Sequence, residues 1–232
     1  MRLTHGQLAR MIDLSAVKAQ DTQQDVRRMA ETALAFECVA AFVLPAMTPL
    51  LIQLLGRGSS TAAGGVVGFP SGADTTPIKV QQARELAGMG CTEIDMVINI
   101  GLLLSGRDAE VRDDIRAVVE EVRPLPVKVI LECHHLTDAH ILTGCDLAIE
   151  AGASFVKTGT GWAGTGATLQ NVALIKAHVG DRIGIKAAGG VRDLETVLEM
   201  ARRGVSRFGL GWRTASAILN EVRALPGGAV EV

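Results

Sequence analysis

Residues 148–158 read AIEAGASFVKT: a helical segment, the small residue Gly152, and a short apolar run that ends at Lys157. The same order recurs in ALAFECVAAFVLP (33–45), LAGMGCTEIDMVIN (86–99) and EMARRGVSRFGLG (199–211). Further apolar runs lie at 10–14, 64–70, 126–132 and 182–190, which brings the number of candidate strands to eight. Between them, segments 75–88, 108–123 and 193–203 repeat apolar residues three and four positions apart, which predicts helices.

The alternation of strands and helices favours a barrel. Strands separated by helices of about 10–15 residues are typical of parallel βαβ units. Eight units in 232 residues, about 29 residues per unit, predict a closed (β/α)8 TIM barrel of the α/β class. No linker, low-complexity tract or charge block divides the chain, so residues 1–232 are expected to form a single domain. An open doubly wound sheet is the rival fold, but no GxGxxG fingerprint follows the first strand.

The composition argues against several classes of protein. The chain is 48% hydrophobic with a formal net charge of −2, so it lacks the basic balance of nucleic-acid-binding proteins. Aromatic residues make up only 3%, which removes stacking platforms for bases. No apolar run approaches the roughly 18 residues of a membrane span, and the N-terminus has no signal-like core. Four scattered cysteines suit reduced thiols, so we expect a cytoplasmic protein. The charge, the aromatic content and the absence of a long apolar run together predict that it binds neither nucleic acid nor membrane.

Two lysines occupy matching places in the repeat. Lys157 ends the sixth predicted strand, and Lys186 ends the seventh one βα unit later. Because neighbouring strands lie about 4.8 Å apart, both amines are expected at the carboxyl-end mouth of the barrel, where such enzymes keep their chemistry. Mutual repulsion and partial burial lower a lysine pKa, and a neutral amine attacks carbonyls to form a Schiff base. A lone lysine at a strand end usually extends to water, but two at equivalent positions favour a catalytic pair.

Two acidic residues lie inside predicted strands. Asp95 interrupts the apolar run EIDMVIN, where a carboxylate is costly unless it is paired or functional. Asp13, in MIDLS, has a similar place on the first strand, but it could equally be a helix N-cap or a surface acid. The residues alone therefore favour Asp95 as a proton-transfer group and leave the role of Asp13 open.

Glycine-rich loops close three consecutive strands: KTGTG at 157–161, AAGG at 187–190 and GLGW at 209–212. Glycine lets backbone N–H groups approach an anion, and the phosphate sites of barrels cluster after the last strands. We therefore predict that these loops contact an anionic substrate. The residues expected there are Thr158, Gly161, Gly189, Gly190, Gly209 and Gly211.

The segment ECHH (132–135) contains residue types that bind metals. Adjacent residues on an extended segment point in opposite directions, so we expect no metal site there. His135 fits a polar position at the rim better, and nothing near Cys133 marks it as an activated thiol.

Five motifs together resemble the 2-deoxyribose-5-phosphate aldolase family, whose members are class I aldolases with a (β/α)8 fold. They are GFPSGADTTPIKV, TEIDMVINIG, KVILE, FVKTGTG and GIKAAGGVR, and the similarity covers nearly the whole chain. The resemblance implies that Lys157 forms the Schiff base, that Lys186 perturbs it and aids proton transfer, and that Asp95 relays a proton through water. It also implies that Asp13 and Lys128 support substrate contacts and the surrounding network.

The implied reaction needs no metal or organic cofactor. Acetaldehyde condenses with Lys157, loss of a proton gives an enamine, and the enamine attacks glyceraldehyde 3-phosphate. Hydrolysis then releases deoxyribose 5-phosphate, and the reverse path serves carbohydrate degradation in deoxyribonucleotide catabolism. The resemblance is compatible with either a homodimer or a homotetramer.

The chain departs from the family pattern in three places. Phe42 and Leu44, in FVLP, replace a cysteine and commonly an asparagine near the substrate. Gly211 and Trp212, in RFGLGWRT, replace two serines at the phosphate end. Trp162 follows TGTG, where the family often has Phe or Lys. The lyase core is therefore intact, whereas the contacts for phosphate are altered.

Three hypotheses follow for the function. The first is cleavage of 2-deoxy-D-ribose 5-phosphate, and the second is the same chemistry on a non-phosphorylated or carboxylated sugar. Arg213 could clamp a phosphate or carboxylate, or it could be a solvated residue in the last helix. The third hypothesis is a sugar-phosphate-binding barrel without turnover, in which Lys157 only ligates an anion.

Overall fold

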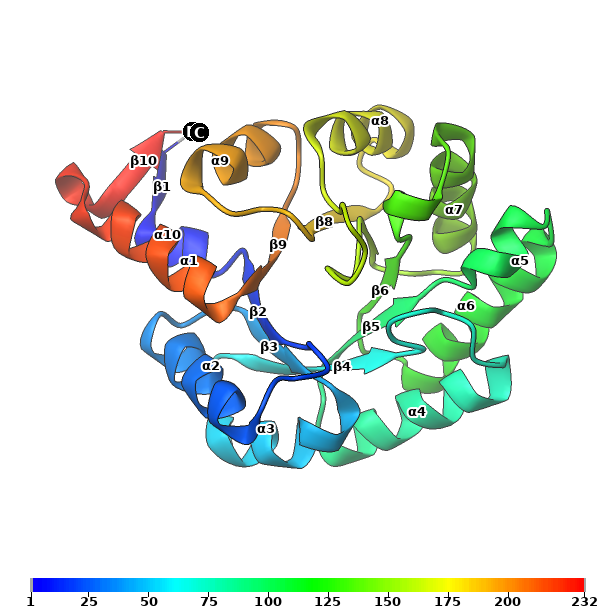
Figure 1. Ribbon diagram of the computed structural model, residues 1–232, viewed down its shortest axis with the longest axis horizontal. Coiled ribbons are helices and arrows are strands. Elements are labelled where there is room, and N and C mark those ends of the chain that lie inside the picture. Colours follow the sequence, from blue (N-terminus) through cyan, green and yellow to red (C-terminus); the bar gives the residue numbers. More distant parts are fainter. Residues whose placement is uncertain (1, 232) are drawn as a thin grey trace.

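The computed structural model describes residues 2–231 and shows a closed barrel of eight parallel strands inside a ring of helices (Figure 1). Strand β9 pairs with β2 to close the barrel. The predicted (β/α)8 fold is confirmed, and each predicted strand overlaps one of the eight. The barrel strands are β2 (Ile12–Ala16), β3 (Ala40–Val43), β4 (Ala62–Val67), β5 (Glu93–Val97), β6 (Val127–Ile130), β7 (Phe155–Lys157), β8 (Gly184–Ala188) and β9 (Arg207–Gly211).

Helices cover the outside of the barrel. The three helices predicted from apolar spacing are α4, α6 and α9, and their ends lie within one residue of the predicted bounds. None of the helices within residues 2–231 has both the length and the apolar character needed to cross a membrane. The helices are α2 (Gln23–Ala35), α3 (Thr48–Leu55), α4 (Thr76–Met89), α5 (Ile100–Leu104), α6 (Asp108–Val122), α7 (Asp138–Glu150), α8 (Leu169–Val179), α9 (Leu194–Arg202) and α10 (Trp212–Ala224), with short 3-10 turns η1 (Pro45–Met47), η2 (Cys133–His135) and η3 (Pro226–Gly228).

The two ends of the described chain pair with each other outside the barrel. Strands β1 (Arg2–Thr4) and β10 (Ala229–Glu231) form a two-stranded antiparallel sheet, and α1 (His5–Ala9) follows β1. Figure 1 shows both ends meeting at one edge of the molecule. The sequence did not predict these strands, because three residues are too few to show a period.

The barrel separates two kinds of interior. Apolar side chains such as Leu14, Ile94 and Phe208 are fully buried between the strands and the helices. Successive side chains of a strand point to opposite faces. The residues directly before and after these apolar ones therefore face the inside of the barrel. On β5 these are Glu93 and Asp95, and both contact side chains from strands across the barrel. A parallel barrel is covered on both faces, so the charged side chains inside it must pair with one another.

Candidate active site

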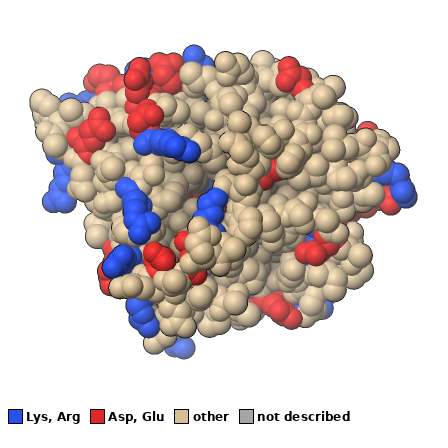
Figure 2. Space-filling model, in the orientation of Figure 1, with Lys and Arg blue, Asp and Glu red and all other residues tan. Residues whose placement is uncertain are grey.

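A cavity of about 390 Å³ lies at the carboxyl ends of the strands. Its walls come from the ends of β2, β3, β4, β7, β8 and β9 and from the loops that follow them. In Figure 2, basic side chains gather over the beginning of α10 and over α2 on this face. Eight of the predicted site residues line the cavity: Asp13, Lys157, Gly161, Lys186, Gly189, Gly190, Gly209 and Gly211.

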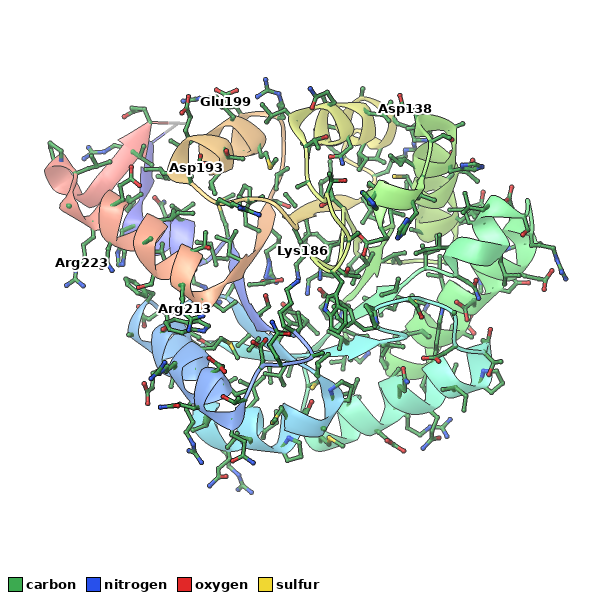
Figure 3. All side chains as sticks on the ribbon, in the orientation of Figure 1. Asp138, Lys186, Asp193, Glu199, Arg213 and Arg223 are labelled. Carbon is green, nitrogen blue, oxygen red and sulfur yellow. The ribbon has the colours of Figure 1, made fainter. Side chains whose placement is uncertain are left out.

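The two lysines lie side by side on adjacent strands. Lys157 on β7 pairs in register with Lys186 on β8. The amine nitrogen Nζ of each donates a hydrogen bond to Oδ2 of Asp95, at 2.8 Å from Lys157 and 2.7 Å from Lys186. Because both amine nitrogens contact the same oxygen atom, they must lie close to each other. Figure 3 shows Lys186 close to the centre of the barrel.

The amine of Lys157 is the chemically unusual group of the site. Burial lowers the pKa of Lys157 from its ordinary 10.5 to about 8, with Lys186 and Lys128 adding to the shift and Asp95 opposing it. Burial therefore contributes more than the neighbouring lysine. With this pKa, about a tenth of the amine is neutral at pH 7. A neutral amine in a cavity can attack a carbonyl carbon.

Asp95 joins the lysines below the floor of the cavity. It is fully buried and does not line the cavity. Burial alone would raise the pKa of Asp95, but the ammonium groups of Lys128, Lys157 and Lys186 lower it well below its usual value. Asp95 is therefore a carboxylate that links three lysines.

Asp13 neither caps a helix nor lies at the surface. Its side chain is 1% exposed and lines the cavity. One carboxylate oxygen, Oδ1, accepts a hydrogen bond of 2.8 Å from Arg207. The other, Oδ2, is buried and forms an ion pair with Nζ of Lys186 at 2.6 Å.

Two predicted substrate-binding residues do not line the cavity. Lys128 is fully buried one layer below, where its Nζ lies 2.5 Å from Glu93 and 3.1 Å from Asp95. Burial disfavours its charge, but Asp95, Asp13 and Glu93 together raise the pKa of Lys128. Thr158 is also buried, and its hydroxyl donates to the carbonyl of Ala188 at 2.8 Å, which ties β7 to β8.

Sequence reasoning missed two members of the charged network, Glu93 and Arg207. Arg207 donates hydrogen bonds to Glu93 at 2.6 Å and to Asp13 at 2.8 Å. Each is the first residue of its strand, where a charged side chain reads as a surface residue. The signal that could have found them is alternation, because Glu93 lies two residues before Asp95 and so faces the same side of β5.

Glu132 is a third residue that was missed. It is buried and has a φ of +55°, an uncommon conformation for a residue with a side chain. Its carboxylate accepts hydrogen bonds from the backbone N–H of Thr160 at 3.2 Å and from the hydroxyl of Thr160. A Cβ at Gly159 would lie 2.8 Å from Glu132 Oε1, so a larger residue there would displace this carboxylate. Glu132 thus fixes the loop that carries Gly161.

Three of the five residues that depart from the family pattern line the cavity: Phe42, Gly211 and Trp212. Phe42 is buried, and its ring lies 4.3 Å from Nζ of Lys186 and 4.7 Å from Nζ of Lys128. A Cβ at Gly64 would lie 2.1 Å from this ring, so the large side chain on β3 requires glycine on β4. Trp162 donates a hydrogen bond from its indole to the carbonyl of Val17 at 2.8 Å, which joins two loops at the mouth.

The segment 132–135 shows no metal-binding geometry. Within residues 2–231, no three His, Cys, Asp or Glu side chains are grouped as metal ligands would be. His134 Nδ1 lies 2.7 Å from the hydroxyl of Thr165. Burial raises the pKa of the Cys133 thiol to about 12, so this cysteine is not an activated nucleophile.

Known proteins share this fold and sequence. Residues 7–212 match the pattern of the DeoC/LacD family aldolases. The deoxyribose-phosphate aldolase of Sinorhizobium medicae is 48% identical over 225 residues, which cover 97% of this chain and 91% of that one. A Coccidioides immitis structure provisionally assigned as a deoxyribose-phosphate aldolase has a TM-score of 0.90 and 32% identity, covering 95% of this chain and 87% of the other. The tetrameric deoxyribose phosphate aldolase of Aeropyrum pernix has a TM-score of 0.84 and 25% identity, covering 96% and 94%.

Proposed function

This chain belongs to the DeoC/LacD family of aldolases, and from this premise we propose that it reversibly cleaves 2-deoxy-D-ribose 5-phosphate to acetaldehyde and D-glyceraldehyde 3-phosphate. The observation that carries the proposal is the amine of Lys157, which is buried, lines the cavity and contacts the carboxylate of Asp95. A lysine in these surroundings has the lowered pKa that Schiff-base formation requires.

The proposed cleavage begins with attack of the neutral Lys157 amine on C1 of the open-chain sugar, and loss of water leaves an iminium ion. The C3 hydroxyl gives up its proton, the C2–C3 bond breaks, and its electron pair forms the C1=C2 bond of an enamine. Glyceraldehyde 3-phosphate is released by this step. Protonation of the enamine at C2 and addition of water then return the free amine and acetaldehyde.

The proposed proton-transfer groups surround the amine. Lys186 lines the cavity and contacts both Asp95 and Asp13, so it can give or take a proton at the bound substrate. Asp95 receives hydrogen bonds from both lysines and can pass a proton between them through water. Asp13 also lines the cavity, and its carboxylate is the proposed acceptor for a substrate hydroxyl.

The opposite side of the cavity supports a phosphorylated substrate. Helix α10 begins after Gly211 without a side-chain cap, so the N–H groups of its first turn are available to an anion. Gly189 and Gly190 have φ of +81° and +97°, which side-chain-bearing residues rarely adopt, and both line the cavity. The side chain of Arg213 is 70% exposed and also lies at this wall. Backbone N–H donors for an anion therefore remain, although the two serines of the family are replaced here. This favours deoxyribose 5-phosphate over a non-phosphorylated sugar as the substrate.

Reductive trapping tests the Schiff base directly. Incubation with acetaldehyde and borohydride should add one ethyl group to the protein, and peptide mass spectrometry should place it on Lys157. Lys157→Ala should abolish both the adduct and turnover, whereas Lys176→Ala, at an outer helix, should leave both unchanged. A wild-type protein without an adduct on any lysine would contradict the enzyme and favour a sugar-phosphate-binding barrel.

A second measurement tests the substrate. The kcat/KM for cleavage of deoxyribose 5-phosphate should exceed that for deoxyribose by at least about 100-fold, since the anion contacts act only on the phosphate ester. A ratio near one would favour the non-phosphorylated substrate.

The proposal includes the setting of the reaction. All four cysteines are free thiols, which supports the cytoplasm as the compartment. The similarity to deoxyribose-phosphate aldolases supports deoxyribonucleotide catabolism as the process. The tetrameric Aeropyrum pernix relative supports a homo-oligomer, a homodimer or a homotetramer. Light scattering after size-exclusion chromatography measures the assembly, and a monomer at micromolar concentration would contradict it.

A further inference from the structure

The charged side chains inside the barrel form one connected cluster with an odd number of members. Four are cations and three are anions, and each contacts at least one member of opposite charge. If Lys157 is neutral, the cations and anions are equal in number. The members are Asp13 on β2, Glu93 and Asp95 on β5, Lys128 on β6, Lys157 on β7, Lys186 on β8 and Arg207 on β9.

Lys157 is the cation with the fewest partners. Its Nζ contacts one carboxylate, whereas Lys186 contacts two, Arg207 contacts two, and Lys128 lies within 3.7 Å of three. A buried cluster with net charge is costly, so it loses the proton that is least well paired. The guanidinium of Arg207 cannot supply that proton, because arginine stays charged in proteins.

Two members of the cluster lie at the end of the barrel opposite the cavity. Glu93 and Arg207 do not line the cavity, and they bind each other at 2.6 Å at the opposite, amino ends of their strands. Both connect to the reacting end through shared partners: Arg207 through Asp13, and Glu93 through Lys128. A change of charge at either position therefore alters the balance around the amine without removing a substrate contact.

We propose that Glu93 and Arg207 are positioning residues that set the charge balance of the barrel interior and thereby the pH at which Lys157 gives up its proton and becomes the nucleophile. The inference rests on the proposed Schiff-base function and extends it to residues that touch no substrate. Other charged groups face the cavity from the β2–α2 loop and from α10, and they lie at its solvent-exposed rim. They are Lys18, Asp21 and Arg213.

Two charge-changing variants should act in opposite directions. The rate at which Lys157 reacts with an aldehyde rises with pH as the amine loses its proton, and this rising part of the pH profile is its acid limb. Glu93→Gln removes an anion, so the acid limb should move to lower pH by about one unit. Arg207→Gln removes a cation, so the limb should move to higher pH by a similar amount, and trapping at pH 7 should slow about tenfold. The double variant restores the balance, so its limb should return to within about 0.3 units of the wild type.

The measurement is the rate of reductive trapping of Lys157 by acetaldehyde and cyanoborohydride as a function of pH, which does not depend on turnover. Glu110→Gln, an equal charge change on the exposed face of α6, is the matched control and should leave the limb in place. Opposite shifts that cancel in the double variant support the inference. Unchanged limbs, or shifts of one sign in both single variants, overturn it.

Failure of the inference can be distinguished from failure of the proposed function. A wild-type protein without any Lys157 adduct contradicts the Schiff base itself, whereas an adduct with unmoved limbs contradicts only the roles of Glu93 and Arg207. If one single variant does not fold, the other single variant and the double variant still decide the outcome. The acid limb of the single variant should be shifted, whereas that of the double variant should match the wild type.

Discussion

The state of Lys157 should be measurable as a pH-dependent stability. Its folded pKa is about 8, whereas an ordinary lysine has 10.5. Between these values the unfolded chain binds a proton that the folded chain has released, so the free energy of unfolding rises with pH across this window. A difference of about 2.5 pKa units corresponds to about 3 kcal/mol, since each unit is worth about 1.4 kcal/mol.

The assay compares the wild type with Lys157→Met in urea unfolding at intervals from pH 7 to pH 10.5. The wild-type free energy minus that of the variant should increase by about 3 kcal/mol over the window, and most of the rise should lie above pH 8. Burial also raises the pKa of the four cysteine thiols, but both proteins contain them, so their contribution cancels in the difference. A flat difference would refute the buried neutral amine, and a falling one would show that the folded protein stabilises its charge.

Three further changes test the surroundings of the site. Asp95→Asn should lower kcat by about 10²–10⁴-fold while moving the acid limb of the pH–rate profile to lower pH, because Asp95 raises the pKa of the nucleophile; an unchanged kcat would contradict its role in proton transfer. Lys79→Met removes the cation that lies 2.6 Å from the buried carboxylate of Asp114 and leaves this charge with only the hydroxyl of Thr76. The variant should cost about 3–5 kcal/mol in denaturant unfolding, and a cost below about 1 kcal/mol would contradict the pairing. Gly64→Ala should lower the free energy of unfolding by about 1–3 kcal/mol, because the added methyl group meets the ring of Phe42. Adding Phe42→Cys should recover most of this loss, and a double variant whose two effects simply add would contradict the steric contact.

The barrel could be predicted because its strands are buried on both faces. Such strands read as short apolar runs, and the repeat of about 29 residues places equivalent residues on adjacent strands. Lys157 and Lys186 were therefore predicted to be neighbours before any contact was known, and they are partners in register. The short strands β1 and β10 could not be predicted in this way, because their pairing depends on residues at opposite ends of the chain.

Depth along the barrel axis was the harder quantity to predict. Lys128 pairs with Phe155, two residues before Lys157, so it lies one layer below the amine of Lys157. Thr158 follows Lys157 directly, and alternation turns it away from the cavity. A motif gives the residue type and the strand, but the register between strands decides which side chains reach the substrate.

The charge balance of the interior follows from the same geometry. Once Lys157 is known to face inward, alternation along each strand and the register between strands identify the other inward residues, and Glu93 and Arg207 are among them. Neither residue belongs to the cavity wall, yet both share partners with groups that do. In a closed barrel the interior has no solvent to absorb an unmatched charge, so a lysine at the mouth responds to an acid at the opposite end. The reactivity of this amine is therefore a property of the whole cluster, and substitutions far from the substrate should shift the pH at which it reacts.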